Sequence, residues 1–548
     1  MKKYHIIFLF PIFLFHSLGS IAQDCNCALK VTPDKNYLDG SNYSIQPGDT
    51  ICIMAGNYKF IQLKNFHGSQ NNRIVIINCG GLVTIGDPTF SYGFVLKGST
   101  FFHVTGTGDP NYTYGIKINH HGFVADGLSN EFEIDHLESH KSAFAGFMAK
   151  TDPQCNDPAT WKENFVMRNI KIHHNTSSES HGEGFYIGFS ANTRECVDQN
   201  GNKSIIYPHV IEGLEFYNNT VKSSGWDGIQ VSKAEKNCNI YNNYIINYAL
   251  ANETAQKYGL ILGTGTSGRI YNNIVIRGSS NTTGSGIAVF ATRDNIIFNN
   301  LIVDAGEDGI FCDDRTVFSD EQYDHIHIIN NTIIRPGRDG YRSYSLIPQG
   351  TKLYNNLIVA PGSLGQYPYN KNREYLFLHK DVTYDTANNV CLPEFDERHF
   401  RNPSGLNFFP TTISPSIDKG KDVSSLGISM DLKYRSRPIG HSFDVGAFEY
   451  TDAQDNVTVL PSKKEDLTKI YAVYNTIFIQ TSEFNDKVRI KVYDLLGKEI
   501  PASINDIEIN DFSKTYQLQI ADNSTRCLIV SIIDREKKVN KKIYIQPK

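Results

Sequence analysis

The chain has 548 residues, of which 12% are aromatic and 20% are charged, and its formal net charge is −5 at pH 7. A nearly neutral chain lacks the basic footprint of a general nucleic-acid-binding protein, so we expect no nucleic-acid partner. Beyond the N-terminal segment, no stretch is apolar over the length that a membrane span requires, and we expect a monomer without such a span.

The first 22 residues have the organisation of a secretory signal. Lys2 and Lys3 precede an apolar run from Ile6 to Leu18, and small residues end at Ala22, where cleavage is expected. We therefore predict a signal peptide over 1–22 and a protein that is secreted or held at the outer cell surface.

A pair of adjacent asparagines recurs through residues 218–356 at intervals of 24 to 31 residues, each time within apolar residues. A fixed interval of this length is the signature of a solenoid. A Gly followed by an apolar residue opens a second short segment after most pairs, as in Gly228-Ile229 and Gly309-Ile310. The apolar residues alternate with period two, which predicts half-buried strands and not helices.

Each repeat is thus expected to hold three strands, stacked in parallel as a right-handed β-helix over residues 23–394. Asn tolerates the left-handed conformation that a sharp bend requires. Amides stacked in register can also hydrogen-bond from coil to coil. Weaker copies of the repeat occur at His173-His174-Asn175 and Asp135-His136.

Three insertions, at roughly 149–164, 190–209 and 313–324, all follow a Gly-apolar segment. They should leave one corner of the solenoid and wall a groove over the Gly-apolar sheet, because long loops in compact domains are often functional.

Ten cysteines in an exported chain permit disulfides. Cys155 and Cys196 lie in neighbouring insertions and are one candidate pair. Cys52 and Cys79 are another, although spacing alone does not settle connectivity. Cys238 and Cys312 fit either a disulfide or a buried, small apolar role.

Short phrases of the chain resemble known families. Residues 44–58, SIQPGDTICIMAGNY, resemble the opening of polysaccharide-acting β-helix proteins, and HGEGFYIG from His181 resembles a phrase of bacterial right-handed β-helix repeat proteins. Residues 395–450 are similar to a closing module found after bacterial surface β-helices. That resemblance implies a cover for the last coil, in which Asp418, Asp444 and Glu449 are structural.

After a polar linker at 451–467, residues 468–548 contain VYDLLGK from Val492 and end in a basic, apolar segment. They resemble the C-terminal sorting domain of the type IX secretion system of Bacteroidetes-type bacteria. The resemblance implies the secretion machinery as a partner. Alternating apolar positions predict that this part is a small β-sandwich.

Outward-facing residues of the Gly-apolar sheet are the candidate site. We predict catalytic roles for Lys233, His181 and Arg315, with Lys233 as the base. The predicted substrate-binding residues are Tyr186, Arg342 and Tyr344. The predicted metal ligands, which could hold Ca²⁺, are Glu183, Asp227, Asp308 and Asp313.

Structural interpretations compete with these roles. An Asp precedes the Gly of the repeat at positions 227, 308 and 339. Such a recurrence is typical of a turn residue whose side chain accepts hydrogen bonds from backbone N–H groups. The residues from Asp313 to Arg315 also fit a solvated loop with an internal ion pair. The histidine pairs at 120–121, 173–174 and 325/327 lack metal-site spacing, and a structural role is expected for them.

We predict that the chain acts on an extracellular, acidic polysaccharide by lyase-type β-elimination. A non-catalytic glycan-binding or adhesion protein is the first alternative. A hydrolase is the second, because Glu183 and Asp227 on consecutive coils, about 4.8 Å apart, could form a carboxylate pair.

Overall fold

The computed structural model of the chain describes residues 25–452, apart from 91, 278–283, 292, 314–324, 346–349 and 363–374. Between 469 and 544 it describes the backbones of the strands alone. The predicted signal peptide and almost all of the predicted linker lie outside these residues. Two compact units, Met1–Asp455 and Asn456–Lys548, are described separately.

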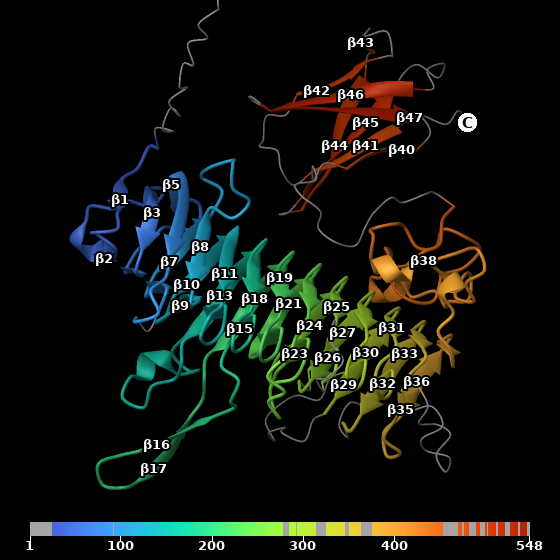
Figure 1. Cartoon of the computed structure of the whole chain (residues 1–548), viewed down its shortest axis with the longest axis horizontal. Helices are drawn as coiled ribbons and strands as arrows, with labels where there is room; N and C mark the ends of the chain where they lie inside the picture. The colour runs from blue at the N-terminus through green and yellow to red at the C-terminus, as the bar shows by residue number, and fades with distance from the viewer. Residues whose placement is uncertain are drawn as a thin grey trace, which may run out of the picture. The chain divides into compact units, whose positions relative to one another are not determined.

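The first unit is the predicted right-handed parallel β-helix, with three ladders of parallel strands (Figure 1). The first ladder precedes the asparagine corner and contains β1 (Leu29–Val31), β3 (Thr50–Tyr58), β5 (Ile74–Ile85), β7 (Thr100–Thr105), β10 (Asn130–Asp135), β13 (Val166–His173), β18 (Val210–Tyr217), β21 (Ala234–Tyr241), β24 (Gly268–Tyr271), β27 (Asn295–Phe298), β30 (Ile326–Ile329), β33 (Thr351–Tyr354) and β36 (Tyr384–Ala387).

The second ladder follows that corner and contains the end of β5, β8 (Ile116–Asn119), β11 (Leu137–His140), β14 (Thr176–Ser178), β19 (Thr220–Lys222), β22 (Tyr244–Ile246), β25 (Ile274–Ile276), β28 (Leu301–Val303), β31 (Thr332–Ile334), β34 (Leu357–Val359) and β37 (Val390–Leu392). The third ladder is the Gly-apolar sheet, with β2 (Tyr37–Asp39), β4 (Ile61–Lys64), β6 (Phe94–Lys97), β9 (Phe123–Asp126), β12 (Phe147–Ala149), β15 (Phe185–Ile187), β20 (Ile229–Val231), β23 (Leu260–Leu262), β26 (Ile287–Val289), β29 (Ile310–Cys312), β32 (Tyr341–Ser343) and β35 (Leu376–Phe377).

The asparagine corner divides two tasks between its two residues. The first residue takes a left-handed φ of 52° to 56° at His174 and at seven asparagines, which are Asn218, Asn242, Asn272, Asn299, Asn330, Asn355 and Asn388. The second is buried, and its Oδ1 accepts hydrogen bonds from the backbone and side-chain amides of the preceding asparagine, as Asn273 does from Asn243 (3.1 and 2.9 Å). Both the predicted bend and the predicted amide ladder are confirmed.

The recurring glycines mark a second corner, where backbone passes directly over the core. A Cβ on Gly228 would lie 2.6 Å from Cγ2 of Ile245 in the second ladder and 2.4 Å from the carbonyl oxygen of Gly259. Only glycine fits there without displacing the inward side chain of the facing ladder. Inside, one continuous apolar core fills the solenoid from Val31 to Ile358.

Residues 395–450 pack along the side of the solenoid and also contact β37 of its last coil, and their role as a closing module stays a prediction. This segment contains η4 (Glu397–His399), β38 (Phe400–Asn402), η5 (Pro403–Gly405), β39 (Asn407–Pro410) and η6 (Ser424–Leu426). Its apolar residues cover the outer face of the second ladder, where Leu301 and Leu357 are buried with Phe408 and Phe448.

The first asparagines of several corners hold the same segment. Asn299 Nδ2 donates to the Met430 carbonyl (2.7 Å), and Asn388 Nδ2 donates to that of Lys419 (2.7 Å). Within the segment, Glu449 is fully buried and pairs with Arg437 at 2.6 Å. Asp444 accepts from the backbone N–H of Asp418 (2.7 Å). These contacts are structural.

The second unit has two four-stranded antiparallel sheets. The strand order in the first sheet is β40 (Lys469–Val473), β41 (Thr476–Thr481), β45 (Ser513–Ile520) and β44 (Ala502–Asn510). The order in the second sheet is β43 (Glu499–Ile500), β42 (Arg489–Tyr493), β46 (Cys527–Asp534) and β47 (Lys537–Tyr544). Two such sheets are what a small sandwich requires, while its sorting function stays a prediction.

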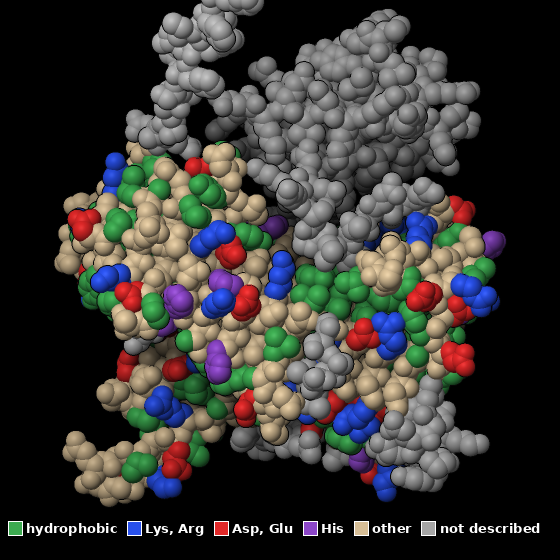
Figure 2. Space-filling model, in the orientation of Figure 1, with side chains coloured by type: hydrophobic (Ala, Val, Ile, Leu, Met, Phe, Trp, Pro, Cys, Tyr) green, Lys and Arg blue, Asp and Glu red, His purple; other side chains and the backbone are tan. Residues whose placement is uncertain are grey.

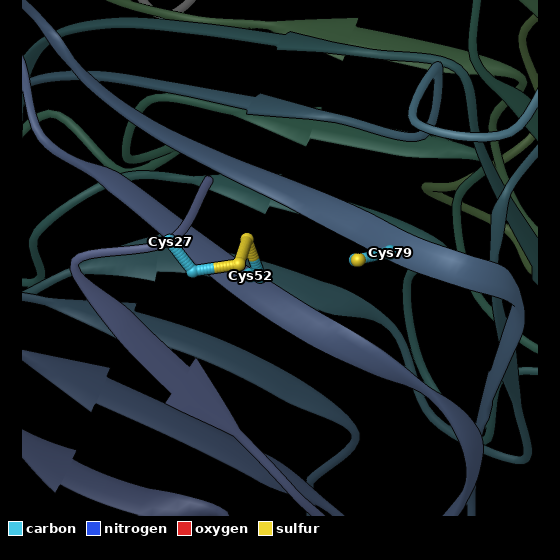
Figure 3. A group of neighbouring side chains, drawn as sticks. All are labelled: Cys27, Cys52 and Cys79. Atoms are coloured by element: carbon cyan, nitrogen blue, oxygen red, sulfur yellow. A yellow bond between two sulfur atoms is a disulfide. The ribbon is translucent and has the colours of Figure 1, made fainter. Parts of the chain in front are cut away.

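Three disulfides occur in the described part of the chain. Cys155–Cys196 is confirmed. The predicted Cys52–Cys79 pair is wrong, because Cys52 is bonded to Cys27 and Cys79 to Cys25. Figure 3 shows the Cys27–Cys52 bridge with Cys79 nearby, so these sulfurs do not form a metal centre. Cys238 and Cys312 are buried and form no disulfide with another described residue, as the alternative interpretation held.

The visible face of the molecule carries acidic and basic side chains intermixed, with histidines over the N-terminal half of the solenoid (Figure 2). This distribution agrees with the small net charge. Among the described residues, no helix has the length and apolar character needed to cross a membrane.

Candidate functional site

Two carboxyl groups lie on consecutive coils at one edge of the third ladder. Glu183 precedes β15 and Asp227 precedes β20, and the Gly184 N–H donates to the carbonyl of Asp227. Adjacent parallel strands are about 4.8 Å apart, so the two side chains start from neighbouring positions in one row.

Both carboxyl groups are buried and incompletely hydrogen-bonded. Glu183 is 1% exposed and Asp227 is fully buried. Asp227 Oδ1 accepts from the backbone N–H of Tyr258 (2.7 Å), but its Oδ2 and Glu183 Oε2 have no hydrogen-bond partner among the described residues. Burial raises the pKa of Glu183 to about 7. Burial and then the nearby Glu183 raise the pKa of Asp227 well above its ordinary value.

A tyrosine lies beside this pair on the same sheet, and a lysine from the opposite edge of the sheet reaches over its ring. Lys150 follows β12, and its Nζ lies 4.3 Å from the centre of the Tyr186 ring and 2.8 Å from Asp152. The Tyr186 hydroxyl is hydrogen-bonded to Ser190 at 2.9 Å. Gln230, in register with Tyr186 on the next coil, is 3% exposed. The positive charge of Lys150 opposes the rise of the Glu183 pKa.

Aromatic rings border the pair on its outer side. Phe144 makes edge contacts with Trp226 (5.4 Å between centres) and with Tyr186 (6.2 Å). His181 is exposed, and its ring centre lies 6.2 Å from that of Trp226. Phe144 is 39% exposed, so an apolar ring face is offered at the surface beside the two acids.

The first two predicted insertions lie next to each other and are joined. The first contains η2 (Pro158–Thr160), and the second contains the hairpin β16 (Arg194–Val197) and β17 (Lys203–Ile206), which projects from the solenoid in Figure 1. The Cys155–Cys196 disulfide and a hydrogen bond from the Lys162 N–H to Tyr207 O (3.0 Å) connect them. The third insertion beyond Asp313 lies outside the described residues, and the groove stays a prediction.

Lys233 and Asp313 lie at the opposite edge of the same sheet. Lys233 follows β20, roughly 17 Å of strand from Gly228 at about 3.3 Å per residue. Its Nζ donates to Asn192 Oδ1 (2.7 Å) and Thr264 Oγ1 (3.1 Å). Asp313 follows β29 and is 3% exposed. Arg315 lies outside the described residues.

The predicted metal ligand Asp308 is held by arginines. It binds Arg338 Nη2 and Arg342 Nε (3.2 Å), and Arg342 Nη2 also binds Asp339 at 2.6 Å. Two guanidinium groups occupy the positions that a cation would need, so the four predicted calcium ligands do not form one site. Arg342 is 3% exposed and donates to the Tyr344 hydroxyl (2.9 Å), which makes both residues part of a structural network.

The recurring aspartates also behave as the structural interpretation held. Asp227 and Asp308 each accept from the backbone N–H of the equivalent residue one coil later, Tyr258 and Asp339. The prediction missed Lys150. A signal was present, because Lys150 follows the Gly146-Phe147 segment and opens the first insertion.

Comparison with known proteins agrees with this fold. A family described as "Right handed beta helix region" matches residues 209–380. No curated protein matches the chain.

Among solved structures, the chain is similar to a periplasmic alginate epimerase, AlgG, with 12% identity over 66% of this chain and 83% of that one (TM-score 0.38). It is similar to XylC in complex with xylose, with 11% identity over 74% and 93% (TM-score 0.40). An alginate lyase from Paenibacillus sp. str. FPU-7 has 10% identity over 66% and 99% (TM-score 0.28).

Proposed function

We propose that the chain acts on an extracellular acidic polysaccharide by β-elimination, at the site formed by Glu183, Asp227, Lys150 and Tyr186. The observation that carries the proposal is the pair of buried carboxyl groups on consecutive coils, each with one oxygen without a hydrogen-bond partner among the described residues. The proposal moves the base from Lys233 to Glu183, because Lys233 is held at the other edge of the sheet.

Glu183 is suited to remove the proton next to the uronate carboxylate. A general base works best with a pKa near the operating pH, and burial raises the pKa of Glu183 to about 7. In the reaction, the carbon–hydrogen electrons form the new double bond as the glycosidic carbon–oxygen bond breaks. The proton passes to Glu183, which can return it to the departing oxygen.

Asp227 and Lys150 are suited to receive the substrate's negative charge. Because the Asp227 pKa is raised well above its ordinary value, its carboxyl stays protonated and can donate a hydrogen bond to a uronate carboxylate. Lys150 adds a fixed positive charge where the intermediate becomes more negative. Because both acids are buried, a neighbouring side chain must move to admit a sugar, and Phe144, which is 39% exposed, is the proposed one.

The spacing of the two acids also suits a hydrolase, which uses carboxyl groups about 5–10 Å apart. A hydrolase needs one acid protonated and the other ionised, which a protonated Asp227 and an ionised Glu183 would also supply. Elimination is the proposal because Asp227 and Lys150 can also offset the charge of a uronate carboxylate, which hydrolysis does not require. The exposed aromatic edge also suits a glycan-binding protein without catalysis.

The test is incubation of the purified chain with a set of uronate polysaccharides, measuring ultraviolet absorbance of an unsaturated product and the number of new reducing ends. Glu183→Gln should lower the rate by about 100-fold or more. Glu179→Gln, an exposed acid four residues earlier that pairs with Lys141, should leave it unchanged. Reducing ends without absorbance would favour the hydrolase, and retention without any product would favour the binding protein.

A further inference from the structure

A histidine–carboxylate cluster lies on the outer face of the first ladder, away from the third-ladder site. His103 comes from β7, Glu133 and Asp135 come from β10, and His173 comes from β13, so three consecutive coils contribute. In register, His103 is beside Glu133 and His173 is beside Asp135. These side chains therefore alternate in one small area of the sheet.

Three potential ligand atoms converge at the centre of this cluster, and a fourth, from His173, lies beside two of them. Nε2 of His103 is hydrogen-bonded to Oδ2 of Asp135. Nε2 of His173 lies 2.9 Å from Oε1 of Glu133 and 3.9 Å from Oδ2 of Asp135. The ligand atoms of His103, Glu133 and Asp135 all lie within 4.8 Å of one another. Four ligands at about 2.1 Å from a tetrahedral Zn²⁺ are themselves roughly 3.4 Å apart, so small side-chain shifts suffice.

The outer oxygens of both carboxylates are held by other groups. Thr105 Oγ1 donates to Oδ1 of Asp135 at 2.6 Å, and His136 Nδ1 lies 2.6 Å from the same oxygen. Arg73 Nη1 donates to Oε2 of Glu133 at 2.9 Å. Each carboxylate thus keeps one oxygen directed at the imidazoles, which is how surrounding groups orient metal ligands in proteins.

The second nitrogen of His173 also has a partner. Its Nδ1 lies 2.8 Å from Nδ1 of His174, whose Nε2 lies 3.1 Å from the Asn218 amide. A metal on Nε2 of His173 requires a proton on its Nδ1. His174 accepts that hydrogen bond in the tautomer that carries its own proton on Nε2, with the Asn218 side chain turned so that its oxygen accepts from Nε2.

We propose that His103, Glu133, Asp135 and His173 bind one divalent transition-metal ion of the Zn²⁺ class. Two imidazoles with two carboxylates suit Zn²⁺, whereas Ca²⁺ and Mg²⁺ prefer oxygen ligands alone. The ion's charge balances the two carboxylates. The side chains of His103 and Glu133 are 27% and 23% exposed, which leaves a path for the ion. Because its ligands come from three coils, the ion joins β7, β10 and β13.

The test is calorimetric titration of the full chain, first treated with chelator, with ZnCl₂, together with the thermal unfolding temperature. One ion per chain and a raised unfolding temperature are expected. Co²⁺ should give the intense visible absorption of a tetrahedral site. Glu133→Gln, which keeps the shape of the side chain, should weaken binding by at least about 10-fold, as should Thr105→Val by loss of orientation.

His140→Ala is the matched control, since His140 is a part-buried histidine on β11, in the second ladder, whose ring is hydrogen-bonded to Ser178 among the described residues. It should bind Zn²⁺ as the unaltered chain does. His173→Ala, which removes one ligand, should also weaken binding of Zn²⁺. If this variant fails to fold, Glu133→Gln and Thr105→Val still test the proposal. Binding that none of these variants weakens, or no binding by the unaltered chain, would overturn the proposal and leave a hydrogen-bonded cluster only.

Discussion

The buried amide ladder makes a quantitative prediction at Asn273. Its Oδ1 accepts from the backbone and side-chain amides of Asn243, and its Nδ2 donates to the Ile240 carbonyl (2.9 Å) and to Asn300 Oδ1 (3.0 Å). Asn273→Ala removes all four hydrogen bonds at a fully buried position. It leaves at least the Asn243 N–H and the Ile240 carbonyl without these partners.

Each buried polar group left without a partner costs about 1–3 kcal/mol, so two such groups predict a loss of about 2–6 kcal/mol. Such a loss is a large part of the total stability of an ordinary domain. Asn239→Ala is the matched control. Asn239 lies on the outer face of β21, and among the described residues its side chain bonds that of Glu215 (2.6 Å), so a loss below about 1 kcal/mol is expected.

The assay is urea unfolding followed by tryptophan fluorescence. The chain has two tryptophans, Trp161 and Trp226, and both lie in the first unit, so the signal reports the β-helix alone. Equal midpoints for Asn273→Ala and Asn239→Ala would refute the view that the ladder stabilises the stack.

Two further predictions concern buried charge. Because the folded pKa of Glu183 is about 7 against an ordinary value of 4.5, the folded state holds a proton that the unfolded state releases, and stability should fall as pH rises from about 4.5 to 7. The fall amounts to about 3 kcal/mol and should be absent in Glu183→Gln; parallel pH profiles of the two proteins would contradict the raised pKa. Arg342→Ala should destabilise the chain by about 3–5 kcal/mol, because it leaves Asp308 and Asp339 buried with fewer partners. Arg335→Ala, which breaks a half-exposed pair with Asp304, should lose less than about 1 kcal/mol, and similar unfolding midpoints for the two variants would argue against this assignment.

The fold was predictable because its repeat is visible in the sequence. The interval between asparagine pairs gave the coil, the period-two alternation gave the strands, and Asn chemistry gave the bend and the ladder. The Cys155–Cys196 disulfide followed from two insertions at one corner. The error at Cys52 and Cys79 came from the N-terminal segment, where Cys25 and Cys27 precede any repeat and supply the actual partners.

The chemistry was less predictable, for a geometric reason. A solenoid brings together residues that are one coil apart, so cluster members are separated by 30 to 40 positions, as His103, Glu133 and His173 are. The short spacings that mark metal sites in other folds are absent, and the histidines at 173–174 therefore looked structural. The contact of two arginines with Asp308 was likewise not predictable, because it depends on the register of β29 and β32.

The lateral placement of residues 395–450 has a consequence for how the solenoid unfolds. In a simple repeat array each coil contacts only its neighbours, and the end coils can fray one at a time. Here a single segment grips corners from Asn242 to Asn388. The last coils cannot peel away without releasing a clamp that also holds coils far behind them. The C-terminal half of the solenoid should therefore melt as one cooperative block, while the N-terminal half keeps the local behaviour of a repeat protein.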